Sequence, residues 1–403
     1  MLIGIDASRA NRALRTGTEW YSFHIIRHLI AVDKENEYVL YLDTEVAADL
    51  AEAIKPYENV HFKVLAWPWP FFWTIGRLSL EMIFKRPDVL FVPAHSLPLI
   101  NPKKTITTIH DIAFARESYL YQKKLMRTDG RKKRLFINAF IKFFSRGKYT
   151  ANSLDYLLWS TLHALKKAKA IIAVSQFTKD EIIGVYSRRY QDKIKVVHNA
   201  YDSSRYVYYN NEETKKAVLQ KYGIETPFFL YVGRLEKKKN TASLVEAFAL
   251  FKEKHPHSLV KLVIIGNAGY GYDEVKYIIE EYNLDSQVII TGWAEEDDMP
   301  VIFSAALAFV FPTLHEGFGI PVLQAMACHC PAIISDLPVL REVAANAAFY
   351  FNPRERQDIL RAMDLVYTDE TLRKSLIEKG IKRASLFSWE KAARETLEII
   401  ESL

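Results

Sequence analysis

The chain has 403 residues, of which 49% are hydrophobic and 25% charged, with a formal net charge of +6. This length exceeds the ~250 to 300 residues at which a single hydrophobic core usually stops growing, so we predict two domains. The net charge is too small for this length to indicate nucleic-acid binding, and charged residues or proline interrupt every apolar stretch before the ~18 residues of a membrane-spanning helix.

The first residues predict a β-strand and no targeting segment. Residues 2–6 read Leu-Ile-Gly-Ile-Asp, without the basic start and the long apolar core of a secretory signal peptide. We therefore expect a cytoplasmic protein.

Short apolar runs alternate with helical patterns over the first 200 residues. The runs that predict strands cover 2–6, 38–42, 60–66, 89–93, 105–110, 170–174 and 194–197. This alternation is typical of a parallel sheet with helices on both faces, so we predict a doubly wound α/β domain.

A second alternating series follows a polar stretch. Its strand-like runs cover 228–232, 260–265, 287–291, 307–311 and 331–335. Residues 201–225 are polar and include Asn-Asn-Glu-Glu, so we expect them to contain the linker. Two doubly wound domains facing one another would place a ligand cleft between the carboxyl ends of their strands.

The turn that follows the run 307–311 combines a carboxylate, glycines and a helix start. Glu316 precedes Gly317, Phe318 and Gly319, and Pro321 is suited to the first turn of the next helix. Glycine allows a ligand to approach the backbone, and the amides and dipole of a helix start favour anions. This turn predicts a site for an anionic ligand.

The turn after the run 228–232 has the same layout with basic residues. It reads Gly-Arg-Leu-Glu-Lys-Lys-Lys, and it makes Arg234 and Lys239 available to neutralise a diphosphate. A solvated basic turn is the alternative for these two residues taken alone. The combination with the Glu316 segment favours ligand binding.

Together the two turns resemble those of the retaining glycosyltransferases with the GT-B fold, specifically glycosyltransferase family 4. The resemblance covers nearly the whole chain. It implies two Rossmann-like domains facing a central cleft, namely an acceptor-side domain over 1–203 and a nucleotide-sugar-binding domain over 204–388. It also implies that a final helix over 389–403 crosses back onto the first domain.

The resemblance assigns roles to residues of the two turns. It implies that Arg234 and Lys239 bind the donor diphosphate, together with the turn at Gly317, Phe318 and Gly319. It further implies that Glu316 is a catalytic contact to the donor sugar. Where the family has a second carboxylate for the nucleotide ribose, this chain has Gln324. A glutamine amide can still accept and donate hydrogen bonds, so the change puts donor affinity in doubt more than the type of reaction.

Two segments of the first domain also match the family. The glycine turn at Gly17 resembles a loop that reaches toward the diphosphate, and a plain helix start capped by Thr16 or Thr18 is an equal alternative. His110 and Asp111 match a pair beside the donor sugar. We prefer His110 as a catalytic-site contact to sugar or phosphate, with Asp111 orienting it; a core histidine bound to a backbone carbonyl is the alternative.

The region from 121 to 169 is basic and aromatic, and its acids are Asp129 and Asp155. Its clustered basic residues are Lys123, Lys124, Arg127, Arg131, Lys132, Lys133, Arg134, Lys142, Arg146 and Lys148. Anionic lipid headgroups attract such clusters, and aromatic residues at helical spacing suit an interfacial helix. We predict peripheral contact with an anionic membrane, at its inner face, in preference to RNA binding or a merely solvated surface.

Cys328 and Cys330 flank His329. Three residues supply too few ligands for a metal, and a disulfide between near neighbours would be strained, so we expect two small buried side chains.

These interpretations converge on a retaining enzyme that transfers a hexose, mannose as the first choice, from a nucleotide diphosphate sugar to a glycan or lipid-linked acceptor. The sequence has no Asp-x-Asp motif, and Arg234 and Lys239 can neutralise the leaving diphosphate, so we expect no metal and no cofactor. The alternatives are a catalytically silent nucleotide-sugar-binding protein, for which Gln324 is the only hint, and another GT-B enzyme such as an epimerase.

Overall fold

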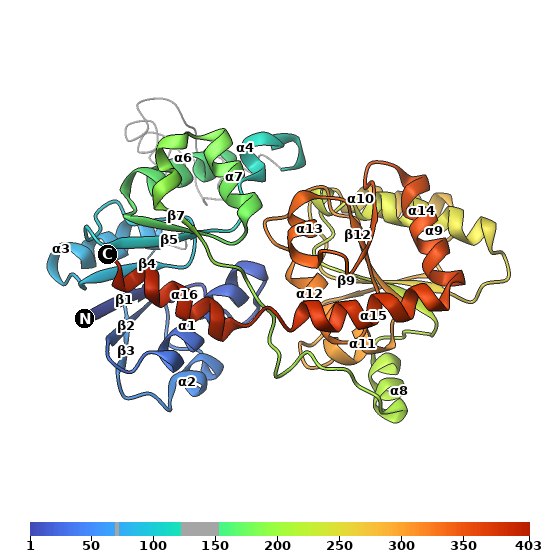
Figure 1. Cartoon of the computed structure of the whole chain (residues 1–403), viewed down its shortest axis with the longest axis horizontal. Helices are drawn as coiled ribbons and strands as arrows, with labels where there is room; N and C mark the ends of the chain where they lie inside the picture. The colour runs from blue at the N-terminus through green and yellow to red at the C-terminus, as the bar shows by residue number, and fades with distance from the viewer. Residues whose placement is uncertain (69–71, 122–152) are drawn as a thin grey trace. The chain divides into compact units, whose positions relative to one another are not determined.

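The computed structural model describes residues 1–68, 72–121 and 153–403 (Figure 1). The chain divides into two compact units, one formed by Met1–Asn199 with Trp389–Leu403 and the other by Ala200–Ser388. The predicted boundary between 203 and 204 falls a few residues after this division. The chain thus leaves the first unit, builds the second, and returns for its last helix.

The first unit is built on a seven-stranded parallel sheet with the order β3-β2-β1-β4-β5-β6-β7. The strands are β1 (Leu2–Asp6), β2 (Glu37–Leu42), β3 (Val60–Val64), β4 (Val89–Val92), β5 (Thr105–Ile109), β6 (Ala170–Ala173) and β7 (Ile194–Val196). The central strands β4, β5 and β6 are buried along their whole length, as their continuous apolar or hydroxyl-bearing sequences require of strands covered on both faces.

Helices cover both faces of this sheet (Figure 1). They are α1 (Gly17–Val32), α2 (Ala48–Ile54), α3 (Leu78–Phe84), α4 (Ala113–Arg116), α6 (Ser153–Lys167), α7 (Gln176–Val185) and α16 (Trp389–Glu401), with short turns η1 (Trp73–Arg77), η2 (Ser118–Leu120) and η3 (Arg188–Lys193). The last helix, α16, packs along α1, where His24 stacks on Trp389 with ring centroids 5.3 Å apart. This contact places the C-terminal segment in the first unit.

The second unit has a six-stranded parallel sheet with the order β10-β9-β8-β11-β12-β13. Its strands are β8 (Phe228–Val232), β9 (Lys261–Ile265), β10 (Val288–Gly292), β11 (Ala308–Phe311), β12 (Ala332–Ser335) and β13 (Phe349–Phe351). Its helices are α8 (Glu212–Lys221), α9 (Thr241–Lys254), α10 (Tyr272–Glu281), α11 (Met299–Ala305), α12 (Ile320–Ala327), α13 (Pro338–Ala344), α14 (Arg356–Thr368) and α15 (Glu370–Ala384), with the turn η4 (Lys237–Lys239). Figure 1 shows α9, α10 and α14 on one face of the sheet and α11, α12 and α15 on the other.

The predicted α/β class is confirmed, since both units are parallel sheets covered by helices. The stretch 201–225, predicted to contain the linker, includes the helix α8, which the sequence analysis did not predict. Asn211 caps this helix by accepting from the Thr214 amide at 2.9 Å, and Glu212 and Glu213 lie in its first turn. The two cysteines are free and buried, as predicted.

Candidate active site

The two glycine-containing turns lie next to each other in the second unit. They follow β8 and β11, which are neighbours in the sheet, so both turns lie at the same carboxyl edge. The carbonyl of Lys238 accepts a hydrogen bond from the Leu314 amide at 2.8 Å. The Thr313 hydroxyl, whose single hydrogen is shared with the His315 carbonyl at 3.0 Å, lies 3.2 Å from the same Lys238 oxygen. These contacts fix the basic turn to the acidic one.

Lys239 and Glu316 form an ion pair across the two turns. Both side chains are largely buried, with 17% of Lys239 and 12% of Glu316 exposed. The Thr313 hydroxyl lies 3.1 Å from the same Glu316 oxygen, so the carboxylate has a cation and a hydroxyl around it. The two residues predicted to bind different parts of a donor therefore touch each other, and a bound ligand has to share or displace this contact.

Arg234 lies at the open side of the basic turn. Its side chain is 59% exposed, and its guanidinium contacts the Glu236 carboxylate at 2.9 Å. An exposed pair of this kind holds weakly, so the guanidinium can turn to an incoming anion at little cost.

The turn that leads into α12 requires glycine at position 319. Gly319 has φ of +102°, and a Cβ there would lie 2.8 Å from the Leu340 side chain. Phe318 is buried against Phe387, with ring centroids 5.8 Å apart. Its side chain packs the turn, so any contact of Phe318 with a ligand would be made by the backbone.

Gln324 lies in the second turn of α12 and is half-buried. Its backbone carbonyl accepts from the Cys328 amide at 3.1 Å. It thus belongs to the helix that begins at the glycine turn, as the sequence predicted.

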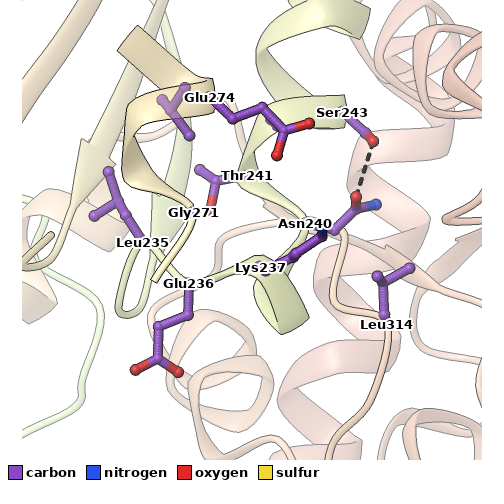
Figure 2. A pocket seen from close by; sticks show the side chains of 11 residues that line it. Leu235, Glu236, Lys237, Asn240, Thr241, Ser243, Gly271, Glu274 and Leu314 are labelled. Atoms are coloured by element: carbon purple, nitrogen blue, oxygen red, sulfur yellow. Dashed lines mark hydrogen bonds between the residues drawn. The ribbon is translucent and has the colours of Figure 1, made fainter. Parts of the chain in front are cut away.

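A pocket opens beside the basic turn (Figure 2). Its wall contains Leu235 and Lys237 of the turn, Glu274 of α10, and Asn240 and Ser243 at the start of α9. Ser243 donates to the Asn240 side-chain oxygen at 2.8 Å, drawn as the dashed line in Figure 2. Arg234, Lys239 and Glu316 do not line this pocket, so it adjoins the charged pair without enclosing it.

In the first unit, Gly17 is the first residue of α1. Thr16 is the N-cap, and its amide and hydroxyl both donate to the Glu19 carboxylate, the amide at 3.2 Å. Burial opposes ionisation of Glu19, but the Thr16 hydroxyl and the charge of Arg9 hold its pKa below the usual value. A Cβ on Gly17 would meet nothing within 4 Å. Gly17 therefore lies at a helix start capped by Thr16, which is the alternative to a ligand-binding loop, and the space beside Gly17 is open.

His110 follows β5, and its Nε2 lies 3.1 Å from the Pro93 carbonyl oxygen. Because a carbonyl only accepts, Nε2 carries the hydrogen, and in the neutral ring the Nδ1 lone pair can accept. Burial lowers the pKa of His110, against the opposing effects of the Pro93 carbonyl and the Asp111 charge. The structure thus shows the alternative considered for His110, a histidine bound to a backbone carbonyl. Its Nδ1 can still accept a hydrogen bond from a ligand.

Sequence reasoning missed two titratable residues of the first unit, the buried Asp6 and the partly buried His95. Asp6 ends β1 and accepts from the Ser8 hydroxyl at 2.6 Å and from the Thr74 hydroxyl at 2.8 Å. Burial raises the pKa of Asp6, and it lowers the pKa of His95 to about 4, where His110 adds a smaller repulsion. The available signal was that Asp6 ends the predicted strand 2–6 and His95 comes shortly after the predicted strand 89–93, because the carboxyl ends of parallel strands meet at one edge.

Within the described ranges, no group of three or more His, Cys, Asp or Glu residues is placed to hold a metal ion. Among those same residues, no helix combines the length and apolar character needed to cross a bilayer. Most of the basic region predicted to contact membranes, 122–152, lies outside the described residues.

Known protein families match both units. Residues 15–205 match the family model Glycosyltransferase Family 4, and residues 212–383 match the model Glycosyl transferases group 1. Together the two matches span most of the chain.

Individual proteins of known name are also similar to this chain. The chain is 28% identical over 330 residues to O-antigen chain mannosyltransferase B of Escherichia coli, covering 80% of this chain and 82% of that protein. It is 29% identical over 238 residues to the serotype-specific mannosyltransferase WbdA of Escherichia coli, a match that spans 59% of this chain but 29% of that relative. The sucrose-phosphate synthase of Thermosynechococcus elongatus has a similar structure, with a TM-score of 0.73, 15% identity, and coverage of 100% of this chain and 98% of that chain.

The two parallel sheets and the family matches define a glycosyltransferase with the GT-B fold. Within this class, the chain belongs to glycosyltransferase family 4.

Proposed function

We propose that the protein transfers mannose from a nucleoside diphosphate donor to a glycan or lipid-linked acceptor, with retention at the anomeric carbon and without a metal ion. The observation that carries the proposal is the contact between the turns after β8 and β11, which pairs Lys239 with Glu316. Arg234 belongs to the same basic turn as Lys239. The mannosyltransferase names of the relatives support the choice of sugar.

The proposed chemistry depends on charge that develops on the leaving diphosphate. Bond cleavage leaves negative charge on the nucleoside diphosphate while the sugar gains positive charge. Arg234 and Lys239 are assigned to the diphosphate, because charge-assisted contacts strengthen as that charge grows. Two cations so placed can neutralise the diphosphate, which is why we propose a metal-independent reaction.

Glu316 is assigned to hydroxyl groups of the donor sugar, because a carboxylate accepts strongly from paired hydroxyls. Its ion pair with Lys239 links the sugar contact to the diphosphate contact. Gln324 is assigned to the ribose, where its amide can accept from one hydroxyl and donate to another. In the first unit, we assign His110 to a sugar hydroxyl, since a neutral ring with a free Nδ1 lone pair accepts and does not pair with phosphate.

The decisive experiment is a donor panel with product analysis. The protein is incubated with GDP-mannose and other nucleotide sugars, with and without a chelator, and released nucleotide is measured. We expect GDP-mannose to be consumed with a chelator present and the new linkage to keep the donor's anomeric configuration by NMR. If the protein binds the nucleotide sugar but releases no nucleotide with any acceptor extract that is added, a catalytically silent binding protein is favoured. A product with the inverted anomeric configuration would refute retention.

Arg234→Ala tests the diphosphate assignment. It removes a charge-assisted contact of about 1.5 to 3 kcal/mol, so calorimetry should show roughly tenfold or greater loss of nucleoside diphosphate affinity. Arg361→Ala is the matched control, because Arg361 is similarly exposed and paired with Asp358 at 2.7 Å on α14. Equal affinities of the two variants would remove Arg234 from the site.

A further inference from the structure

The amino edge of the first sheet carries basic residues for which the transfer reaction has no use. Parallel strands all start at this edge, and segments 85–88, 101–104 and 166–169 lead into the neighbouring strands β4, β5 and β6. The seven basic residues of these segments, here named the basic edge, are all exposed: Lys85, Arg86, Lys103, Lys104, Lys166, Lys167 and Lys169. The same segments contain one acidic residue, Asp88.

Backbone hydrogen bonds hold the three segments side by side. The Leu90 amide donates to the Lys104 carbonyl at 3.0 Å, and the Lys169 amide donates to the Thr105 carbonyl at 2.8 Å. With strands about 4.8 Å apart, the charges form a row about 10 Å wide on a rigid support.

These charges are not neutralised within the part of the chain that the structure describes. None of the seven forms an ion pair there, whereas Lys221 and Lys254 of the second unit contact carboxylates at 2.8 and 2.7 Å. Asp88, which accepts from the Leu2 amide at 2.8 Å, offsets one of the seven positive charges. The basic edge therefore presents net positive charge to its surroundings.

An exposed apolar face adjoins the basic edge. Leu80, Ile83 and Phe84 are spaced i, i+3 and i+4 on α3, so they share one side of the helix, and they are 47%, 42% and 81% exposed. The helix ends at Phe84 and passes directly into Lys85 and Arg86. Figure 1 shows α3 at the end of the sheet where β1 begins.

We propose that the basic edge and the apolar face of α3 together form a docking surface for an anionic membrane. Anionic lipid headgroups attract clustered lysines, and apolar side chains at a helix end can enter the interface below the headgroups. A nucleic acid would satisfy the charge but would leave Leu80, Ile83 and Phe84 exposed to water. The combination therefore favours lipid over other polyanions.

The position of this surface has a consequence for the acceptor. His110 lies at the carboxyl edge of the same sheet, so the basic edge and His110 lie at opposite ends of the strands. A strand of four or five residues spans about 13 to 17 Å, so docking raises the carboxyl edge at least that far above the headgroups. Such an orientation suits an acceptor that extends away from the membrane.

The experiment measures vesicle binding alone, so it does not depend on the donor assignment. The full chain is floated with vesicles of phosphatidylcholine, with and without phosphatidylglycerol. We expect binding only with the anionic lipid. Each basic residue near an anionic surface contributes about fivefold to binding, so Lys103→Glu with Lys104→Glu should weaken it by roughly 25-fold or more. Phe84→Ser, at a site where folding has little need of the ring, should remove the binding that persists in high salt.

The control is Lys379→Glu with Lys382→Glu, which makes the same change of net charge at exposed positions of α15. It should bind as the parent does. The proposal is overturned if both pairs weaken binding equally, or if only reversal of Lys132, Lys133 and Arg134 weakens it. Absence of vesicle binding overturns it as well, and retention by RNA alone would do so in favour of a nucleic acid.

Discussion

The buried ion pair between Lys239 and Glu316 can be tested by removing its cation. Lys239→Met keeps the length of the side chain but removes the cation that contacts the Glu316 carboxylate, while the Thr313 hydroxyl stays 3.1 Å from that carboxylate. A hydrogen bond to a charged group contributes about 1.5 to 3 kcal/mol, so we expect a loss of about 2 kcal/mol. For a domain of this size, that loss lowers Tm by roughly 4 to 8 °C.

Glu316→Gln distinguishes loss of the pair from loss of packing. In the Lys239→Met background it removes the unpaired charge while leaving an oxygen that can accept from Thr313. We therefore expect the double variant to be more stable than Lys239→Met alone, although both lack the pair. Thermal unfolding of the four proteins gives the coupling between the two positions.

Lys374→Met is the matched control, because the Lys374–Glu370 pair has a 2.7 Å contact but is mostly exposed. Its Tm should stay close to that of the parent. If Lys239→Met changes Tm no more than Lys374→Met does, the carboxylate does not need the cation and the reasoning fails. The same variants should bind nucleoside diphosphate about tenfold or more weakly when Lys239 is absent, by calorimetry.

Three further predictions concern other parts of the two units. Gly319→Ala should destabilise the second unit by about 2 kcal/mol, because it combines a left-handed φ with a 2.8 Å approach to Leu340; an unchanged denaturation midpoint would contradict this. Gln324→Glu should tighten binding of a nucleoside diphosphate severalfold by giving the ribose a charged acceptor, and equal or weaker binding in calorimetry would remove Gln324 from the site. The pKa of His95 is about 4 in the folded chain against an ordinary 6.5, so the unfolded chain binds more protons between these values and stability falls as pH drops from 6.5 toward 4. His95→Gln should flatten that decline in denaturation curves recorded across this range, and identical slopes would show that other groups control it.

Periodicity predicted the strands because most of them are short and largely buried. The runs 2–6 and 228–232 coincide with β1 and β8, and the other predicted strands differ from the observed ones by a residue or two at their ends. The strand β13 was missed, because the sequence analysis placed no strand after 331–335; Phe349–Phe351 is as short as β7, which was predicted. Tertiary packing at the edge of the sheet stabilises it.

The helix α8 was missed for a different reason. The helix is strongly polar and Leu219 is its one buried residue, so its sequence has no apolar stripe from which a helix could be predicted. The Asn211 cap stabilises it locally, and the ion pair of Lys221 with the distant residue Asp298 at 2.8 Å attaches it to the rest of the unit. Polar composition alone is therefore a poor guide to a linker.

The position of each turn of the candidate site could be predicted from the sequence, but the contact between the two turns could not. Both turns follow strand-like runs, so their place at the carboxyl edge of a parallel sheet could be anticipated. Their direct contact could not, because it requires β8 and β11 to be neighbours although β9 and β10 intervene in the sequence. Asp6 and His95 were not predicted because their pKa values depend on burial by residues distant in the sequence. Such burial leaves no pattern in the local sequence.

The return of α16 to the first unit has a consequence for synthesis of the protein. During translation, α1 emerges early, but Trp389, which stacks on His24, leaves the ribosome only after all of Ala200–Ser388. At 5 to 20 residues per second, this interval lasts roughly 10 to 40 s. Throughout it, the apolar side of α1 lacks its covering helix, so the second unit has time to fold completely before the first one can. A nascent chain stalled before Trp389 would thus expose the apolar face of α1, to which chaperones can bind. The first unit, although synthesised first, would complete its folding last.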